Sequence, residues 1–320
     1  MNGLLRRLYH LVRPLLILLG PSNVVMRLCT SFLANCMCMA HGTRVSFKRD
    51  HLDIIKRDKV LRLNPGHWIY TLALSRDFDA YFDCVVPTFV GNRQIVDYSQ
   101  PRLQKFRLSG LEFEVASFPE EEKAILDYFR LYKPQAGETV FDLGANCGLS
   151  VYYLSQAVGP AGKVYAFEPD PVNYGVMLGN IARHQLSNVV PLRKAIAADT
   201  GNLEFFSEGT IGSTLARQSS RRTTGNVITV EAITLAGACQ AYGIPTFIKM
   251  DIEGAEIEVI AASRDFLAKN PIQFAIDTNH WKDGQLTSHK VESLFAECGY
   301  EVSSSADSGF STTWATKAVT

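Results

Sequence analysis

Short apolar runs and longer segments of helical periodicity alternate along the second half of the chain. The runs are rich in β-branched and aromatic residues, as expected for strands that are buried on both faces of a parallel sheet. They lie at residues 139–141, 163–167, 189–196, 247–250 and 272–276, and the helical segments lie at 148–158, 170–184, 255–267 and 288–298. The alternation predicts an α/β, Rossmann-like fold with a mostly parallel sheet and helices on both of its faces.

Two other patterns mark the ends of this predicted domain. At its start, residues 111–116 alternate between apolar and polar positions like a strand. Residues 119–132 begin with a proline and an acidic first turn, which favours a helix. At its end, residues 300–303 and 312–316 predict an antiparallel hairpin that closes the sheet. We therefore expect one domain over residues 111–320.

The residues before this domain fall into two segments of different composition. Residues 50–110 contain several turn signals and many aromatic residues, which predicts a small appended region that could cover the substrate side of the predicted domain. Residues 1–49 are apolar and basic, contain no Asp or Glu, and carry a formal charge of +7. Their apolar run at 15–19 is far shorter than the about 20 residues of a membrane-spanning helix. Three interpretations stay open for residues 1–49: a helical appendage, a membrane-surface helix and a targeting segment.

Charge and cysteine content narrow the function and the location. The whole chain has a formal net charge of zero, so the residues after 49 carry −7, which argues against a basic cleft for nucleic acid. The seven cysteines include no C-x-x-C pair and are expected to be reduced thiols. We expect a cytoplasmic protein without a nucleic-acid partner. Peripheral membrane contact through residues 1–49 is left open.

A glycine-containing turn follows the first apolar run of the predicted sheet. It has the form D-x-G-x-N-x-G and is made of Asp142, Gly144, Asn146 and Gly148. Glycine allows positive φ angles and has no Cβ, so a ligand can approach the main chain closely. The turn lacks the three glycines of a dinucleotide-binding motif, and its acid would repel a pyrophosphate. Strand, turn and helix therefore predict a site for a nucleoside-like ligand that carries amines and hydroxyls.

Acidic residues recur where the predicted strands end. The strand-end groups are Asp142, Glu168, Asp251, Glu253, Asp277 and His280. The carboxyl ends of parallel strands meet at one edge of a sheet, and ligands bind at that edge. Because acids are almost never buried without a partner, core packing alone does not account for this repetition. Glu168, after the second strand, is placed to hold the two hydroxyls of a ribose.

Three blocks of the sequence, FDLGANCG, AFEPDP and IKMDIEGAE, occur in this order along the chain. They resemble the signature blocks of the FkbM-type methyltransferases that use S-adenosylmethionine, and the resemblance covers residues 111–320. It implies a class I methyltransferase fold with S-adenosylmethionine as the cofactor. The implied cofactor contacts are Asp142, Gly144, Asn146 and Gly148 for the methionine end and the sugar, and Glu168 for the ribose hydroxyls.

The resemblance also implies a reaction, the methylation of a hydroxyl on a sugar, a glycolipid or a secondary metabolite. The partner is then a small-molecule, sugar or lipid-linked acceptor. For a hydroxyl acceptor, the enzyme must align the oxygen with the methyl group and remove a proton. Asp251 is expected nearest the methyl group, and His280 is either the other candidate base or a structural histidine. Glu253 either binds the acceptor or caps the following helix.

Other functions stay open or are disfavoured by the residues. Asp251 and Asp277 with His280 could ligate a divalent metal, but no coordination set is defined and we expect no metal. A non-catalytic scaffold or sensor of the same fold would be expected to lack Asp251, which is present. A nicotinamide-dependent oxidoreductase would need the three-glycine turn that is missing here. A methyltransferase with a nitrogen or protein acceptor remains an alternative.

Overall fold

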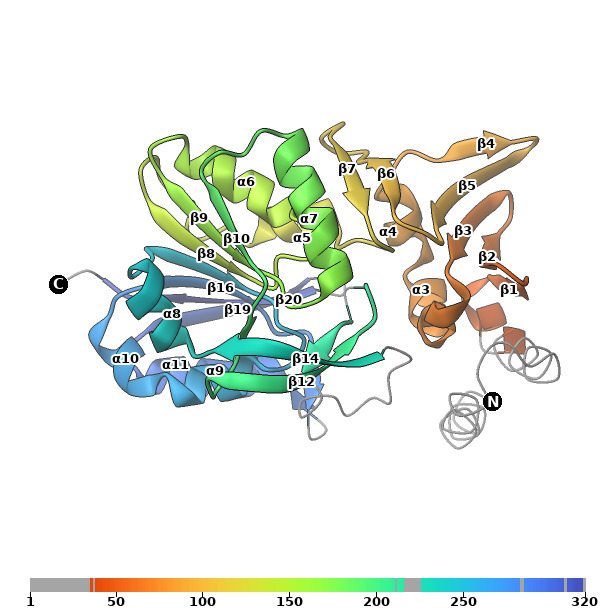
Figure 1. Cartoon of the computed structure of the whole chain (residues 1–320). Helices are drawn as coiled ribbons and strands as arrows, with labels where there is room; N and C mark the ends of the chain where they lie inside the picture. The colour runs from red at the N-terminus through yellow and green to blue at the C-terminus, as the bar shows by residue number, and fades with distance from the viewer. Residues whose placement is uncertain are drawn as a thin grey trace. The chain divides into compact units, whose positions relative to one another are not determined.

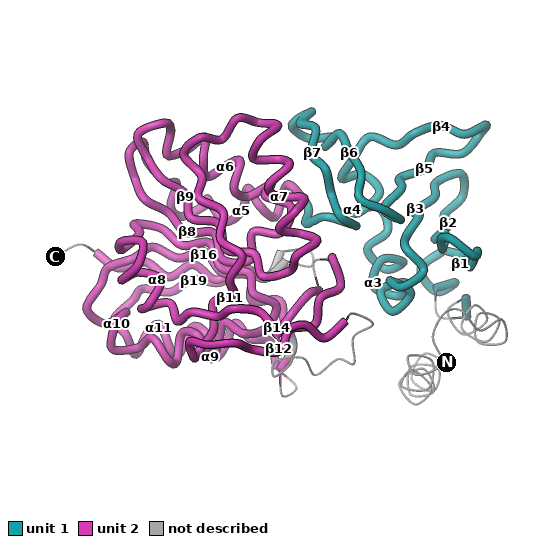
Figure 2. Tube along the Cα trace, in the orientation of Figure 1, with its two compact units in different colours: residues 1–121, 221–225 teal, residues 122–220, 226–320 magenta. Residues whose placement is uncertain are grey.

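The computed structural model describes residues 35–36, 38–210, 212–215, 226–282, 285–307 and 310–318 of the 320-residue chain. The chain divides into two compact units, and their main boundary in the sequence lies between Glu121 and Glu122 (Figure 2). Most of the basic segment 1–49, and with it the three interpretations above, lies outside the described residues. Among the described helices, none combines the length and the apolar character that crossing a membrane requires. The cysteines among the described residues are free.

The first unit is built mainly from strands (Figure 1). Its elements in chain order are η1 (Met39–His41), β1 (Arg44–Phe47), β2 (Leu52–Lys56), β3 (Lys59–Leu63), η2 (Pro65–Tyr70), α3 (Thr71–Arg76), α4 (Phe78–Asp83), β4 (Thr88–Val90), β5 (Arg93–Tyr98), β6 (Arg102–Lys105) and β7 (Glu112–Val115). One mixed sheet has the order β1-β2-β3-β5-β4, in which β3 and β5 run parallel. Phe78 and Phe82 of α4 are buried and stack with ring centroids 5.6 Å apart. These aromatic residues therefore form part of the unit's own core.

The expected domain start at residue 111 differs from the observed boundary. Residues 112–115 do form a strand, but this strand, β7, pairs antiparallel with β6 in the first unit. Alternation along a strand shows which face is buried and leaves the pairing partner unspecified, so the pattern could not assign β7 to a unit. The helix expected at 119–132 is also shorter, since α5 spans Glu122–Asp127.

The second unit contains the alternating strands and helices that the pattern predicts. Its elements in chain order are α5 (Glu122–Asp127), β8 (Thr139–Leu143), α6 (Leu149–Val158), β9 (Lys163–Phe167), α7 (Pro171–Arg183), β10 (Val189–Leu192), β11 (Ala195–Ile196), β12 (Gly201–Ser207), β13 (Thr214–Leu215), β14 (Asn226–Ile233), α8 (Leu235–Tyr242), β15 (Phe247–Met250), α9 (Glu256–Ala262), α10 (Arg264–Lys269), β16 (Gln273–Asp277), β17 (Trp281–Lys282), β18 (Gln285–Leu286), α11 (Thr287–Glu297), β19 (Glu301–Asp307) and β20 (Phe310–Thr316). The predicted ranges for β8, β9, β15, β16, α6, α7 and α11 agree with these bounds to within two residues.

One large sheet organises the second unit. Its strands lie in the order β10-β9-β8-β15-β16-β20-β19. The pairs from β10 to β16 are parallel, while β20 runs antiparallel to both β16 and β19, as the C-terminal hairpin predicts. Figure 1 shows α6 and α7 on one side of this sheet and α8, α10 and α11 on the other. The predicted Rossmann-like α/β fold is confirmed.

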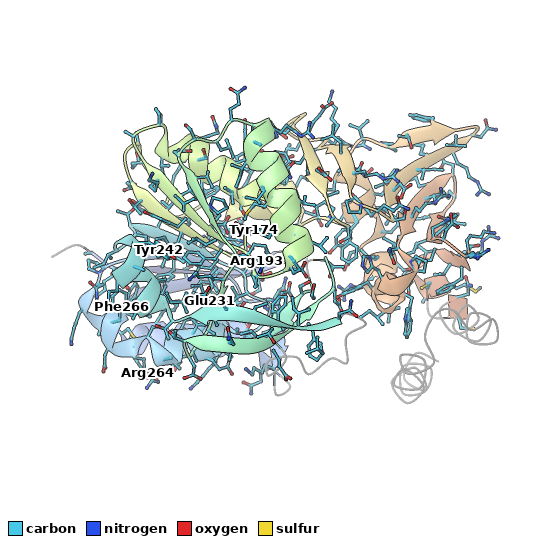
Figure 3. The ribbon with its side chains drawn as sticks, viewed as in Figure 1. Tyr174, Arg193, Glu231, Tyr242, Arg264 and Phe266 are labelled. Carbon is cyan, nitrogen blue, oxygen red and sulfur yellow. The ribbon has the colours of Figure 1, made fainter. Side chains whose placement is uncertain are left out.

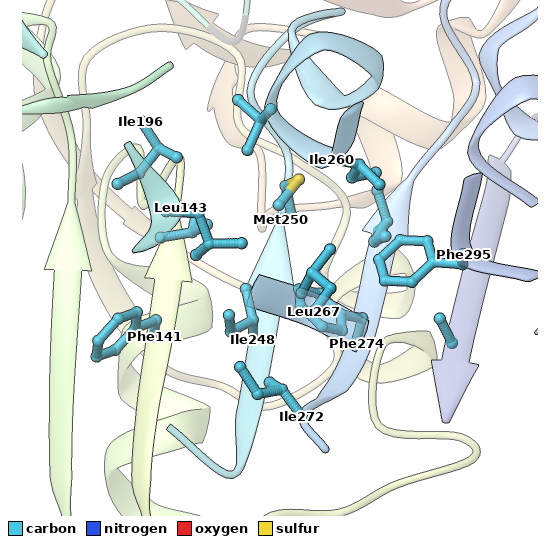
Figure 4. Packing of buried hydrophobic residues seen from close by; sticks show 14 of the residues in the cluster. Phe141, Leu143, Ile196, Ile248, Met250, Ile260, Leu267, Ile272, Phe274 and Phe295 are labelled. Atoms are coloured by element: carbon cyan, nitrogen blue, oxygen red, sulfur yellow. The ribbon is translucent and has the colours of Figure 1, made fainter. Parts of the chain in front are cut away.

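The core lies on both faces of this sheet, because alternate residues of each strand point to opposite faces. Leu143 of β8 and Met250 of β15 are fully buried in the cluster that includes α8, α9, α10 and α11 (Figure 4). Val140 and Phe247, on the same strands but out of phase, pack on the opposite face with residues of α6 and α7. Burial of both faces explains why the strand runs are almost continuously apolar.

The run expected as one strand at 189–196 forms two strands in different sheets. β10 pairs with β9 in the large sheet, whereas β11 pairs with β14 in a smaller sheet of order β11-β14-β12-β13. The polar residues Arg193 and Lys194 lie at the break between them. The third strand of the large sheet is therefore shorter than predicted, and the chain leaves it before the apolar run ends.

Helix α8 has no counterpart among the predicted segments. Its start is set by Thr234, whose side chain accepts a hydrogen bond from Gly237 N at 3.1 Å. Tyr242 at its end, labelled in Figure 3, packs on Tyr165 of β9 with ring centroids 5.1 Å apart. The single helix expected at 255–267 is instead two helices, α9 and α10.

Candidate active site

The turn between β8 and α6 adopts the backbone that its sequence requires. Gly144, Asn146 and Gly148 have φ angles of 82°, 47° and 86°, in the left-handed region that glycine and asparagine tolerate best. A Cβ at Gly144 would lie 1.7 Å from the main-chain oxygen of Asp251. The turn therefore packs directly against the residue that follows β15, and the ends of β8 and β15 belong to one site.

Asp142 and Lys249 form a fully buried ion pair below this turn. The register of β8 and β15 places the two residues side by side, and Lys249 Nζ lies 3.4 Å from Asp142 Oδ1. Lys249 also donates a hydrogen bond to Gly144 O at 2.8 Å. Ser150 Oγ of α6 donates one to Asp142 Oδ2 at 2.5 Å. Asp142 thus connects the end of β8 to α6 and, through Lys249, to the turn, while its direct contact with a cofactor stays a prediction.

Glu168 connects the end of β9 to the same turn. Its Oε2 accepts a hydrogen bond from Asn146 N, and its Oε1 accepts one from Asp170 N, each at 2.8 Å. The residue is 4 % exposed, and burial raises the pKa of its carboxyl to about 8. The structure therefore brings together Asn146 and Glu168, two of the residues that the resemblance assigns to the cofactor.

The turn and Glu168 fit a ligand that carries a ribose. Each carboxylate oxygen has two lone pairs, so Glu168 can accept two ribose hydroxyls and keep its backbone hydrogen bonds. Gly144 and Gly148 have no Cβ, which lets the turn pack closely against Asp251 and Met177 and keeps its positive φ angles unstrained. The acid below the turn would oppose a pyrophosphate, and it suits the amine-bearing and hydroxyl-bearing parts of S-adenosylmethionine.

A second polar group lies beyond the ends of β15 and β16. Asp251 and Glu253 follow β15, and His280 follows β16. Two carboxylate oxygens and one imidazole nitrogen, one atom from each residue, lie within 4.8 Å of one another. His280 Nε2 is 3.4 Å from Glu253 Oε2. The three predicted catalytic residues are neighbours, and we call them the acceptor trio.

Glu256 completes the surroundings of the acceptor trio, although the sequence pattern assigns it only to a helix. It is the first residue of α9, is fully buried, and its Oε1 accepts hydrogen bonds from Ile252 N at 3.0 Å and Gly254 N at 3.3 Å. Its Oε2 lies 3.8 Å from His280 Nδ1 and has no hydrogen-bond partner among the described residues. The sequence could have indicated its part in the site, because Glu256 is the third acid of the block IKMDIEGAE.

Acidic side chains dominate the electrostatics around His280. Burial lowers the pKa of this histidine. The nearby charges of Glu256, Glu253 and Asp277 outweigh burial and hold the pKa of the imidazole well above 6.5. Burial raises the pKa of Glu256, against the influence of His280. Asp251 Oδ1 is buried and has no hydrogen-bond partner among the described residues, so it is an available proton acceptor.

Asp170 holds the segment between β12 and β13 close to the acceptor trio. Its fully buried carboxylate accepts five hydrogen bonds of 2.8–3.2 Å. The donors are Val172 N and Asn173 N of α7, Ser207 Oγ at the end of β12, and Gly209 N and Ser213 Oγ of the segment. Thr214 Oγ1, at the start of β13, donates a hydrogen bond to Glu253 O at 3.0 Å. The sequence pattern identifies Asp170 only as a helix start, which its N-cap role confirms.

The residues that cluster in the structure differ from the metal-binding set that the sequence suggested, Asp251, Asp277 and His280. Asp277 Oδ1 accepts a hydrogen bond from Asn279 N at 2.9 Å, and Asp277 is not one of the three clustered residues. Glu253 takes its place beside Asp251 and His280. Glu253 has a φ angle of 56°, so a left-handed turn after β15 determines its position, and no strand pattern predicts such a turn.

The sequence of this chain is similar to that of a known protein family. The family model of the methyltransferase FkbM domain matches residues 142–302, half of the chain. The 31-O-demethyl-FK506 methyltransferase FkbM of Streptomyces tacrolimicus is 27% identical over 159 residues, which cover 40% of this chain and 60% of that protein. The hexuronic acid methyltransferase AglP of Haloferax volcanii is 27% identical over 139 residues, which cover 42% of this chain and 54% of that protein.

A shorter match concerns the catalytic subunit TRM61 of the tRNA (adenine(58)-N(1))-methyltransferase of Yarrowia lipolytica. It is 33% identical over 72 residues, which cover 22% of this chain and 18% of that protein. This chain covers less than two thirds of the length of each of these three relatives. The matched range 142–302 begins at the glycine turn and contains Glu168 and the whole acceptor trio. The chain therefore belongs to the FkbM family of methyltransferases, whose cofactor is S-adenosylmethionine.

Proposed function

We propose that this protein transfers a methyl group from S-adenosylmethionine to a hydroxyl oxygen of a sugar, a glycolipid or a secondary metabolite. The observation that supports this most is the acceptor trio of Asp251, Glu253 and His280 beside the glycine turn. These carboxylate and imidazole groups can bind a hydroxyl, and a carboxylate among them can accept its proton. The names of two relatives, which mention a 31-O-demethyl compound and a hexuronic acid, agree with such an acceptor.

The residues of the site divide the work of the proposed reaction. Bound S-adenosylmethionine supplies a methyl group on a positively charged sulfur. Glu168 would hold the ribose hydroxyls, and the turn that carries Asn146 would lie against the sugar and methionine parts. Asp251 would take the proton of the acceptor, because its Oδ1 has no other hydrogen-bond partner among the described residues. Glu253 would orient the acceptor together with His280, whose two ring nitrogens face carboxylates.

A methyl-transfer assay with isotopically labelled S-adenosylmethionine would test this proposal. The acceptor panel would contain sugars, uronic acids, glycolipids and hydroxylated small molecules. We expect label in at least one hydroxyl-bearing acceptor, and a loss of rate of about 100-fold or more in Asp251→Asn, in line with the usual effect of a general base. Asp265→Asn, the same change at an exposed position of α10, should retain the rate.

Two other outcomes would replace the proposal. Tight binding of S-adenosylmethionine without transfer to any acceptor would support a non-catalytic scaffold or sensor with this fold. Transfer only to nitrogen or to protein acceptors would keep the methyltransferase and reject the hydroxyl acceptor. Mass spectrometry of the labelled product distinguishes the atoms, because an O-methyl and an N-methyl product fragment differently.

A further inference from the structure

The acceptor trio has the composition and spacing of a cation site. Asp251 and Glu253 each offer a carboxylate oxygen, His280 offers a ring nitrogen, and these three atoms lie within 4.8 Å of one another. All three residues are partly buried, so the side chains hold a limited set of positions. Oxygen and imidazole ligands in this proportion suit a divalent ion such as Mn²⁺ or Mg²⁺.

A separate observation concerns the unpaired polar atoms at the trio. The Glu256 carboxylate is fully buried, and its Oε2 faces His280 Nδ1 at 3.8 Å, with neither atom in a hydrogen bond among the described residues. Asp251 Oδ1 is also buried and without a partner in the described part of the chain. Buried polar atoms are normally paired, since leaving them unpaired is unfavourable. Glu256 Oε2 and His280 Nδ1 can satisfy each other, whereas Asp251 Oδ1 faces no donor among the described residues and therefore indicates an absent positive group.

Charge balance supports the same conclusion. Asp251, Glu253 and Glu256 are acidic, and His280 is the one basic side chain within 4 Å of Glu253 or Glu256 among the described residues. Lys282, two residues after His280, forms an ion pair with Glu258, and Lys249, two residues before Asp251, forms one with Asp142. Among the described residues, no Lys or Arg forms an ion pair with the three acids. A divalent cation would supply the charge that the side chains lack.

The orientation of His280 fits a metal-binding histidine. Its Nε2 faces Glu253, inside the trio, and its Nδ1 faces Glu256, outside it. Histidines that bind a metal through one ring nitrogen commonly donate the other N–H to a carboxylate, which sets the tautomer and the ring orientation. Glu256 is itself held in place by the backbone N–H groups of Ile252 and Gly254.

We propose that Asp251, Glu253 and His280 bind one divalent cation of the Mn²⁺ or Mg²⁺ class, and that Glu256 positions His280 for it. Three protein ligands leave coordination positions open for water and for an acceptor oxygen. The role of the ion in holding a hydroxyl acceptor rests on the proposed function above, but the existence of the site does not. Asp251 has two carboxylate oxygens, so it can ligate through one and accept a proton through the other.

Manganese titration of the metal-stripped full-length protein tests the site directly. The electron paramagnetic resonance signal of free Mn²⁺ falls when the ion binds, and no S-adenosylmethionine or acceptor is needed. We expect one Mn²⁺ per chain, displaced by excess Mg²⁺. Asp251→Asn and His280→Gln should each weaken binding by at least about tenfold, and Glu256→Gln by about tenfold, the usual effect of a residue that orients a ligand.

Control variants separate loss of the site from loss of the fold. Asp265→Asn, on an exposed position of α10, should bind Mn²⁺ like the unaltered protein. Each variant must keep its circular dichroism spectrum and its affinity for S-adenosylmethionine, because Glu168 and the turn are unchanged. Absence of stoichiometric Mn²⁺ binding, or binding that all three site variants leave unchanged, would overturn the cation site.

The outcomes also distinguish this inference from the proposed function. Methyl transfer that persists in a chelator, with no Mn²⁺ bound, would reject the ion and leave the hydroxyl methyltransferase intact. Stoichiometric Mn²⁺ binding that depends on His280, in a protein that transfers no methyl group, would confirm the site and reject its proposed use.

Discussion

Lys249 is a fully buried cation among the apolar residues of β15. Lys249 Nζ contacts Asp142 Oδ1 and Gly144 O, which belong to the end of β8 and its turn. The pair therefore connects two neighbouring strands directly below the glycine turn. An ion pair so deeply buried adds little net stability, because the desolvation of both charges opposes their attraction. Its main effect is to fix the positions of the two strand ends.

Removal of one member of this pair should be strongly destabilising. Lys249→Met leaves Asp142 buried without its counter-charge, and we expect a loss of about 3–5 kcal/mol in the free energy of unfolding. Denaturant unfolding followed by circular dichroism measures it. Lys269→Met, at an exposed position of α10, is the matched control and should change stability little. The double variant Lys249→Met with Asp142→Asn should recover part of the loss, and a purely additive result would contradict the pairing.

Gly144 provides a steric test of the turn. In Gly144→Ala the new Cβ would meet the main-chain oxygen of Asp251 at 1.7 Å, at a φ angle of 82° that alanine rarely adopts. We expect the turn to shift and S-adenosylmethionine affinity to fall, as measured by calorimetric titration. Gly175→Ala is the control, because this helical glycine has no atom within 4 Å of its Cβ position. It should be neutral or more stable by up to about 1 kcal/mol, and equal affinities in both variants would contradict the role of Gly144.

Glu168 should make cofactor binding depend on pH. Burial raises the pKa of its carboxyl to about 8 in the free protein, so the group is mostly protonated at pH 7. Hydrogen bonds from the ribose hydroxyls favour the ionised form and lower this pKa. Binding of S-adenosylmethionine at pH 7 should therefore release a proton from Glu168, and affinity should rise between pH 6 and pH 8. Calorimetry in buffers of different ionisation enthalpy measures the release, and Glu168→Gln should remove its contribution.

At the scale of elements, Asp170 joins α7 to the segment between β12 and β13 through its five hydrogen bonds. We expect Asp170→Ala to increase hydrogen exchange in that segment and to raise the KM for the acceptor, since Thr214 holds Glu253 from its end. Thr234→Ala, which removes the single cap bond of α8, is the control and should cost about 1 kcal/mol without either effect. Unchanged exchange between β12 and β13 would contradict the role of Asp170.

The large sheet could be predicted because strands that are buried on both faces appear as short, continuous apolar runs, and helices that are buried on one face show helical periodicity. Because β8 and β15 pair in parallel, their register then places Asp142 next to Lys249. Pairing partners could not be predicted, since β7 and β11 have ordinary strand patterns and join other sheets.

The candidate site was predictable only in part for a related reason. The strand-end acids Glu168 and Asp251 follow from the sheet edge. The approach of Glu256 to His280 depends on a left-handed turn at Glu253 and a contact between distant segments. The sequence shows the three acids of IKMDIEGAE. Only the folded turn shows that Asp251 and Glu253 lie in the acceptor trio and that Glu256 lies behind His280.

At the scale of the whole molecule, the glycine turn, Glu168 and the acceptor trio all lie in the second unit, which has its own two-faced core. We therefore expect the fragment of residues 122–320 to fold and to bind S-adenosylmethionine with nearly the affinity of the full chain. Calorimetric titration and thermal unfolding of the fragment measure this. The sequence suggests that residues 50–110 cap the acceptor side, and if so the fragment should bind the cofactor yet transfer methyl groups poorly. Full activity in the fragment would reject the cap, and a fragment that fails to fold would show that the second unit depends on the first for its stability.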